Sequence, residues 1–129
     1  MPELFRCPTA DGKPNRATYV AVVGDETLWP GPYGTEGREI RDGFHSTVAI
    51  LELADSDIHW MEPRDLTFEE AVAAFEGKPG APKLEQHPGG IVIGFADGRV
   101  RLLSREFLRK HSNAMLTRAG GEEFRWPDE

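Results

Sequence analysis

The most distinctive chemical pattern in this chain is a histidine that is followed, after nine intervening residues, by an Asp-Gly pair. His87 and Asp97-Gly98 lie in the stretch HPGGIVIGFADGRVRLLS, residues 87–104. An imidazole and a carboxylate form a general acid–base pair, or hold a metal ion, when their side chains meet. If the intervening residues form an extended strand, the two side chains lie about 25–30 Å apart. We therefore expect structural roles for His87, Gly90, Asp97 and Gly98, with the imidazole hydrogen-bonded to nearby backbone; a ligand-binding role for His87 is the alternative.

The other histidines give no metal-binding pattern by spacing. The chain has four histidines, which are 14, 28 and 24 positions apart: His45, His59, His87 and His111. Zinc sites read from sequence need much closer pairs of ligands. A loop site is the alternative, and its best ligands are Asp42, His45, Asp55 and Asp57, where carboxylates would suit calcium. The competing interpretation is that these aspartates accept hydrogen bonds within turns.

Two further residues carry reactive or ionisable groups. Cys7 is the only cysteine, which excludes a disulfide within the chain. It is either an unpaired thiol or one half of a bridge to another chain. Glu52 alternates with Val48 and Ile50 in an apolar run, so its carboxylate is expected to point inward. A backbone amide or an arginine is its expected partner, and only an unusual partner would make it a functional candidate.

Strands must position most of these residues. The segments 17–23 and 47–53 are apolar and rich in β-branched residues, which predicts two strands. Asp97-Gly98 favours a two-residue type I′ turn that pairs Ala96 with Arg99 and makes a hairpin over 91–103. In that register, five apolar side chains would share one face of the sheet: Ile91, Ile93, Phe95, Val100 and Leu102.

Two helices complete the expected architecture. Thr67 and Glu70 form a capping box at the start of a helix over 67–76. Ser104 can cap a second helix over 105–118. The predicted fold class is therefore α+β, in one domain over residues 1–129: an antiparallel sheet with a C-terminal β-hairpin and two flanking helices.

Charge and composition exclude several functions. The chain has 15 Lys and Arg against 22 Asp and Glu, a net charge of −7, with no basic cluster. Nucleic-acid binding is therefore not expected, because it needs clustered positive charge. The apolar runs are only strand-sized, so we expect no membrane contact from this segment. Phosphate-binding and nucleophile-elbow motifs are missing, and we expect the protein not to be an enzyme.

Five segments, in order, resemble the bacterial H-X9-DG domain family, whose members are pseudopilin-like proteins associated with prepilin-type processing. They are FRCPTADG at 5–12, RDGFHSTVAILEL at 41–53, IHWMEPRDLTFEEA at 58–71, HPGGIVIGFADG at 87–98, and LTRAGGEE at 116–123. We call the fourth segment, which runs from His87 to Gly98, the signature. The resemblance implies a pilin-like globular domain with a non-catalytic structural or assembly role in a secretion- or pilus-related envelope system. It also implies protein partners, such as like subunits or a homodimer.

The resemblance covers the C-terminal globular part of such proteins. The family's prepilin cleavage site and long N-terminal helix have no counterpart here, so an apolar sheet face should be covered by the 105–118 helix or buried in a homodimer. The resemblance implies a cell-envelope or extracytoplasmic location, whereas a stand-alone form would be soluble or cytoplasmic. Some related pseudopilins hold calcium in loops, and this favours calcium over zinc. The alternative function is a small ligand- or calcium-binding domain that uses loops 41–46 and 55–60.

Overall fold

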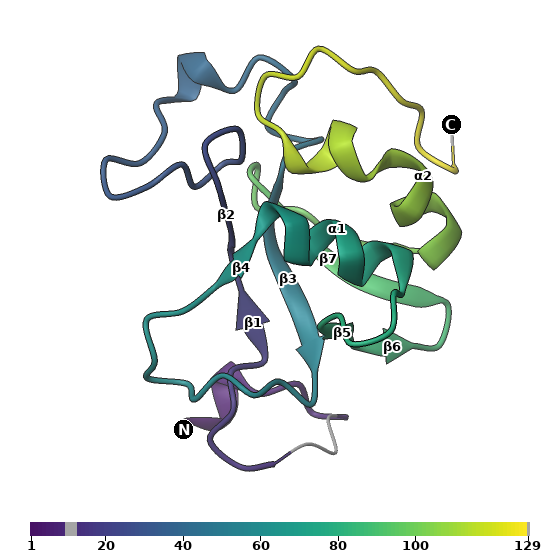
Figure 1. The fold of residues 1–129 in the computed structure, drawn as a ribbon. Coiled ribbons are helices and arrows are strands. Elements are labelled where there is room, and N and C mark those ends of the chain that lie inside the picture. Colours follow the sequence, from purple (N-terminus) through teal and green to yellow (C-terminus); the bar gives the residue numbers. More distant parts are fainter. Residues whose placement is uncertain (10–12, 129) are drawn as a thin grey trace.

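An antiparallel sheet carries two helices on one of its faces (Figure 1). The computed structural model describes residues 1–9 and 13–128, and its fold class is α+β, as predicted. The helices are α1 (Phe68–Glu76) and α2 (Arg105–Leu116), with short 3-10 turns η1 (Glu3–Phe5) and η2 (Gly37–Glu39). The strands are β1 (Tyr19–Val20), β2 (Val22–Val23), β3 (Val48–Ala54), β4 (Leu66–Thr67), β5 (Lys83–Leu84), β6 (Gln86–His87), β7 (Gly90–Phe95) and β8 (Val100–Leu103).

Strand β3 is the centre of the sheet. It pairs with β1 along one side and with β7 along the other. The short strands β5 and β6 lie between the far end of β3 and the start of β7, because β5 pairs with β3 while β6 pairs with β7. The amide of Glu85, between β5 and β6, also donates to the carbonyl of Glu52 at 3.0 Å. This insertion carries His87 to the neighbourhood of β3.

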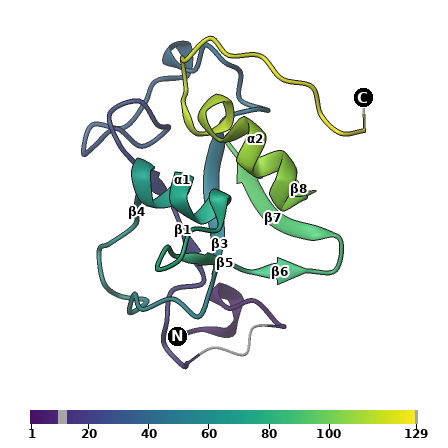
Figure 2. The same cartoon turned by 45° about the vertical axis from the view of Figure 1, so that its right-hand side comes forward.

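The turn between β6 and β7 explains the Pro-Gly-Gly sequence that follows the histidine (Figure 2). His87 pairs with Gly90, and Pro88 and Gly89 form the connection. Proline followed by a glycine with positive φ, here +94°, is the pattern of a type II turn. At Gly90, a Cβ atom would lie 2.5 Å from the carbonyl oxygen of Leu103, so no side chain fits there.

The β7–β8 hairpin forms as predicted in kind, but its predicted register is wrong by one residue. The amide of Phe95 donates to Arg99 at 2.9 Å, which makes a three-residue loop, and Gly94 pairs with Val100. Gly98 has a φ of +84°, whereas φ of Asp97 is not positive, so the turn is not type I′. A positive φ at the last loop residue is typical of a three-residue hairpin with a bulge. The extra loop residue turns Val100 and its neighbour Leu102 to the opposite face from the buried residues of β7.

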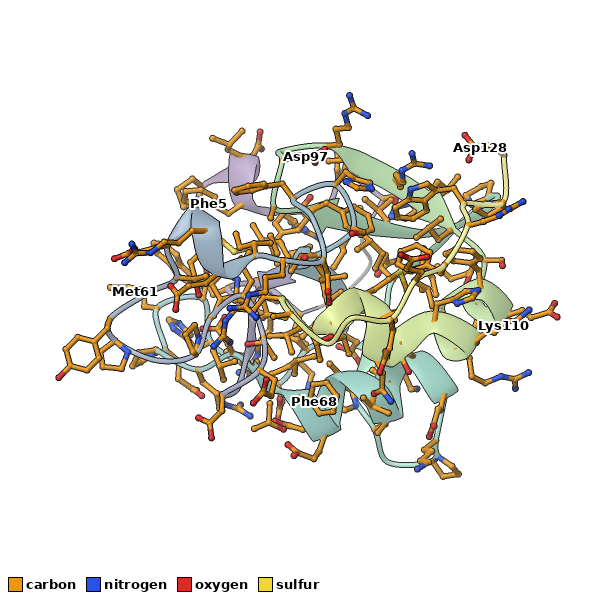
Figure 3. The ribbon with its side chains drawn as sticks, turned by 90° about the horizontal axis from the view of Figure 1, so that it is seen from above. Phe5, Met61, Phe68, Asp97, Lys110 and Asp128 are labelled. Atoms are coloured by element: carbon orange, nitrogen blue, oxygen red, sulfur yellow. The ribbon has the colours of Figure 1, made fainter. Side chains whose placement is uncertain are left out.

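Both helices begin as the sequence predicts. The hydroxyl of Thr67 accepts from the amide of Glu70 at 3.1 Å, and the Glu70 carboxylate accepts from the amide of Thr67 at 3.0 Å. Ser104 accepts from the amide of Phe107 at 3.1 Å. Figure 3 shows Phe68 at the start of α1 and Lys110 on α2. These caps satisfy amides that have no partner within the helix.

The main core lies between the helices and one face of the sheet. Its fully buried side chains come from both layers: Leu51, Phe75, Ile91, Ile93, Leu108, Met115 and Leu116. The C-terminal tail adds Trp126, which packs edge-on against Phe95 with ring centroids 5.3 Å apart. In the part of the chain that the structure describes, neither helix has the length and apolar character needed to cross a bilayer.

Candidate functional site

The imidazole of His87 points away from the helices and meets a carboxylate. Its Nε2 atom lies 3.0 Å from Oε2 of Glu52. We expected a backbone partner for this imidazole, and the structure instead gives it an acidic side chain from β3. The physical reason is the insertion of β5 and β6 between β3 and β7, which places the end of β6 beside Glu52.

The carboxylate that His87 contacts belongs to Glu52. From the sequence, we treated Glu52 as a functional candidate only if its partner proved unusual. It pairs across the sheet with Tyr19, on the face away from the helices, and its exposed fraction is 3%. Burial raises the pKa of the Tyr19 phenol, and the nearby Glu52 and Cys7 raise it further. The Tyr19 side chain therefore lies close to both Glu52 and Cys7, although it is itself 43% exposed.

Cys7, in the N-terminal segment, is the third residue that lies close to Glu52 and His87. Its thiol is free, and the residue is 3% exposed. Its Sγ atom lies 3.9 Å from Nε2 of His87 and 3.3 Å from the hydroxyl oxygen of Thr9. Of the two alternatives for Cys7, its burial favours the unpaired thiol, because a residue only 3% exposed is poorly placed to form a bridge to another chain.

Three possible ligand atoms therefore converge in what we call the Cys7–Glu52–His87 cluster. Its sulfur, carboxylate oxygen and ring nitrogen all lie within 4.8 Å of one another. A thiol–imidazole–carboxylate relay needs the acid at one ring nitrogen and the sulfur at the other. Here both contacts involve the same nitrogen, Nε2. The arrangement is thus a convergence on one point and not a relay.

Asp97 and Gly98 of the signature lie away from the Cys7–Glu52–His87 cluster. Asp97 is in the loop at the far end of β7 from Gly90, and its Oδ1 accepts from the amide of Arg99 at 2.9 Å. Its own amide donates to the carbonyl of Phe44 at 3.1 Å. The structure therefore does not bring His87 and Asp97 together.

The four loop residues expected to hold an ion are also separated. Asp42 and His45 precede β3, whereas Asp55 and Asp57 follow it, and a strand of seven residues spans about 20 Å. The two carboxylate oxygens of Asp42 accept from the amides of Gly120 and Gly121 at 2.8 and 2.9 Å. Asp57 instead pairs with Arg64 at 3.3 Å. The two halves of this set lie at opposite ends of the sheet and cannot share one ion.

A second feature of the same sheet face is apolar and uncovered. We call it the open face and define it by Ile50, Val92, Val100 and Leu102. Ile50, Val100 and Leu102 are 44%, 66% and 48% exposed. The pairing of Ile50 with Gly94, of Gly94 with Val100, and of Val92 with Leu102 places these side chains in adjoining rows. We expected either the C-terminal helix or a second copy of the chain to cover an apolar sheet face. Helix α2 packs on the opposite face of the sheet, so it does not cover this one.

Comparisons with known proteins add no assignment to this geometry. The chain matches no protein-family model, and the searches of curated proteins and of solved structures likewise returned no match.

Proposed function

We propose that the protein is a non-catalytic assembly module of a pseudopilin-like, secretion- or pilus-related envelope system, and that it joins a second copy of its own chain through the open face. One observation carries the proposal. The three exposed residues of the open face form adjoining apolar rows on a sheet whose other face holds both helices. Contiguous exposed apolar side chains on a folded domain mark an interaction surface.

Several features support a second copy as the occupant. All four residues of the open face are uncharged and apolar, so the face is chemically complementary to itself. A two-fold axis places the same patch on both partners, which is the commonest symmetry of homo-oligomers. Two sheet faces pack well at about 10 Å. The family resemblance, which implies partners of the same kind, agrees with this choice.

The geometry of the cluster supports a non-catalytic role. A nucleophile, a base and an orienting acid need a shared axis of proton transfer. In the Cys7–Glu52–His87 cluster, one ring nitrogen faces both the sulfur and the carboxylate. We therefore place the biological role in association and not in turnover.

The net charge of the chain gives the association a characteristic salt dependence. Each copy carries a formal charge of −7, so two copies repel each other at low ionic strength. Salt screens this repulsion and leaves burial of the apolar rows almost unchanged. Dimerisation through the open face should therefore strengthen as salt is added, whereas an interface built on ion pairs would weaken.

Sedimentation velocity over a range of concentration and salt tests the proposal. We expect reversible dimers of the wild-type chain, tighter in high salt, and their loss in Val100→Asp. The control is Met61→Asp, because Met61 is 71% exposed and Figure 3 shows it well away from Asp97 at the hairpin tip. Circular dichroism verifies that both variants fold. A wild-type chain that stays monomeric at all concentrations, or dimers that Val100→Asp leaves intact, would overturn the proposal.

A further inference from the structure

The Cys7–Glu52–His87 cluster combines three donor types at one point beneath the N-terminal segment. Two of its residues, Cys7 and Glu52, are almost completely buried, and the His87 side chain is 20% exposed. An isolated buried carboxylate is costly to ionise, and proteins keep such a group where it pairs or binds a metal ion. We infer that this cluster is a binding site for one divalent transition-metal ion of the zinc type.

The spacing of the donor atoms suits a tetrahedral ion. Bonds of about 2.0–2.1 Å to nitrogen and oxygen, and about 2.3 Å to sulfur, put the nitrogen and oxygen of such a site about 3.3 Å apart and the nitrogen and sulfur about 3.6 Å apart. The observed distances from Nε2 of His87 are 3.0 Å to Glu52 and 3.9 Å to Cys7. These two separations are within a few tenths of an ångström of the tetrahedral values. The sulfur and the carboxylate oxygen lie within 4.8 Å of each other, and an ion would draw them to about 3.6 Å.

The donor set selects the class of metal. A thiolate and an imidazole are preferred ligands of zinc and similar transition metals. Calcium and magnesium instead take six or more oxygen ligands. The cluster provides one carboxylate in addition to the sulfur and the nitrogen, so the ion expected here is zinc and not the calcium expected in the loops. The three protein donors leave one coordination position for water or another small ligand.

The position of the ligands defines what the ion would do. Glu52 lies in the central strand β3 and His87 in β6, so both are held by the sheet. Cys7 belongs to the segment before β1, which lies beside the end of β3 (Figure 1). An ion bound to all three would fasten this N-terminal segment to the sheet. Binding should therefore stabilise the folded chain, since ligands bind the native arrangement and not the unfolded one.

Titration of the metal-free, reduced protein tests the site. Isothermal titration calorimetry with Zn²⁺ should give one ion per chain, and binding should be lost in Cys7→Ser, Glu52→Gln and His87→Gln. The matched control is His59→Gln, because the Nδ1 atom of His59 accepts from the amide of Met61 in its own loop. Val100→Asp, which disrupts the proposed dimer, should bind zinc normally, so the two proposals fail independently.

Cobalt substitution guards against variants that merely unfold. In the wild-type chain, Co²⁺ should give the strong visible bands of a tetrahedral site and a thiolate-to-cobalt absorption in the near ultraviolet. Cys7→Ser should lose the sulfur absorption, and circular dichroism shows whether it remains folded. Failure of the wild-type chain to take up one Zn²⁺, or a cobalt spectrum that Cys7→Ser leaves unchanged, would overturn the inference.

Discussion

Nε2 of His87 lies 3.0 Å from Oε2 of Glu52, although 35 positions separate the two residues in the chain. This contact crosses from β6 to β3 and does not involve Asp97, the other polar residue of the signature. His87 and the Asp97-Gly98 pair therefore have different structural roles at opposite ends of β7. One end faces a buried carboxylate and thiol, and the other end shapes a hairpin loop.

Gly90 and Gly98, which both belong to the signature, should differ in their tolerance of alanine. Gly98→Ala places a side chain at positive φ but in open space, so we expect a loss of about 1–2 kcal/mol in unfolding free energy. Gly90→Ala adds a Cβ atom 2.5 Å from the Leu103 carbonyl oxygen, as well as an unfavourable φ of +145°. The expected loss is about 3 kcal/mol or more. Urea unfolding of both variants measures the difference, and equal losses would contradict the role given to the β6–β7 turn.

Asp42 should stabilise the fold through its hydrogen bonds, and calcium should not change the stability of the chain. Asp42→Ala removes the acceptor of two backbone amides, those of Gly120 and Gly121, and should cost about 1.5–3 kcal/mol. Asp57→Ala is the comparison, because its exposed ion pair with Arg64 is worth about 0–1 kcal/mol. Thermal unfolding with and without Ca²⁺ provides the measurement. We expect no shift with calcium in either the wild type or the variants, and a shift abolished by Asp42→Ala would restore the loop as an ion site.

His111 should make stability depend on pH. Burial, followed by the nearby positive charge of Lys110, lowers the pKa of the His111 imidazole in the folded chain. The unfolded chain, with an ordinary histidine pKa of about 6.5, then takes up a proton first as the pH falls. This contribution to stability is present above about pH 6.5 and is lost as the pH falls through that value toward the folded pKa.

His111→Phe isolates this effect, because it keeps a ring beside Phe107 and Phe124, whose centroids lie 4.6 and 5.3 Å from that of the imidazole. Urea unfolding at about pH 7.5 and about pH 5.5, on either side of the ordinary histidine pKa, should show a smaller loss of stability for the variant than for the wild type. Equal losses in the two proteins would mean that His111 does not contribute.

Local patterns account for the elements that the sequence predicts. The run 47–53 becomes β3, and the capping residues Thr67 and Ser104 start α1 and α2 as expected. The hairpin register could not be predicted, because Asp-Gly suits both a two-residue loop and a three-residue loop with a final left-handed glycine. Apolar residues on both faces of the hairpin strands fit either choice.

The cluster could not be predicted because it depends on tertiary structure. Cys7, Glu52 and His87 meet only because β5 and β6 separate the ends of β3 and β7 and the N-terminal segment returns to this face. No helical or strand period relates their positions. One signal was available: each residue falls in a different segment of the family resemblance, at 5–12, 41–53 and 87–98.

A double-mutant cycle on the metal-free protein tests most directly whether the contact between His87 and Glu52 stabilises the fold. The cycle combines His87→Gln with Glu52→Gln and measures unfolding free energies in urea. We predict a coupling of about 0.5–3 kcal/mol for this pair, whereas His87→Gln with Asp97→Asn should be additive within about 0.5 kcal/mol. Additivity between His87 and Glu52, together with coupling between His87 and Asp97, would contradict the account.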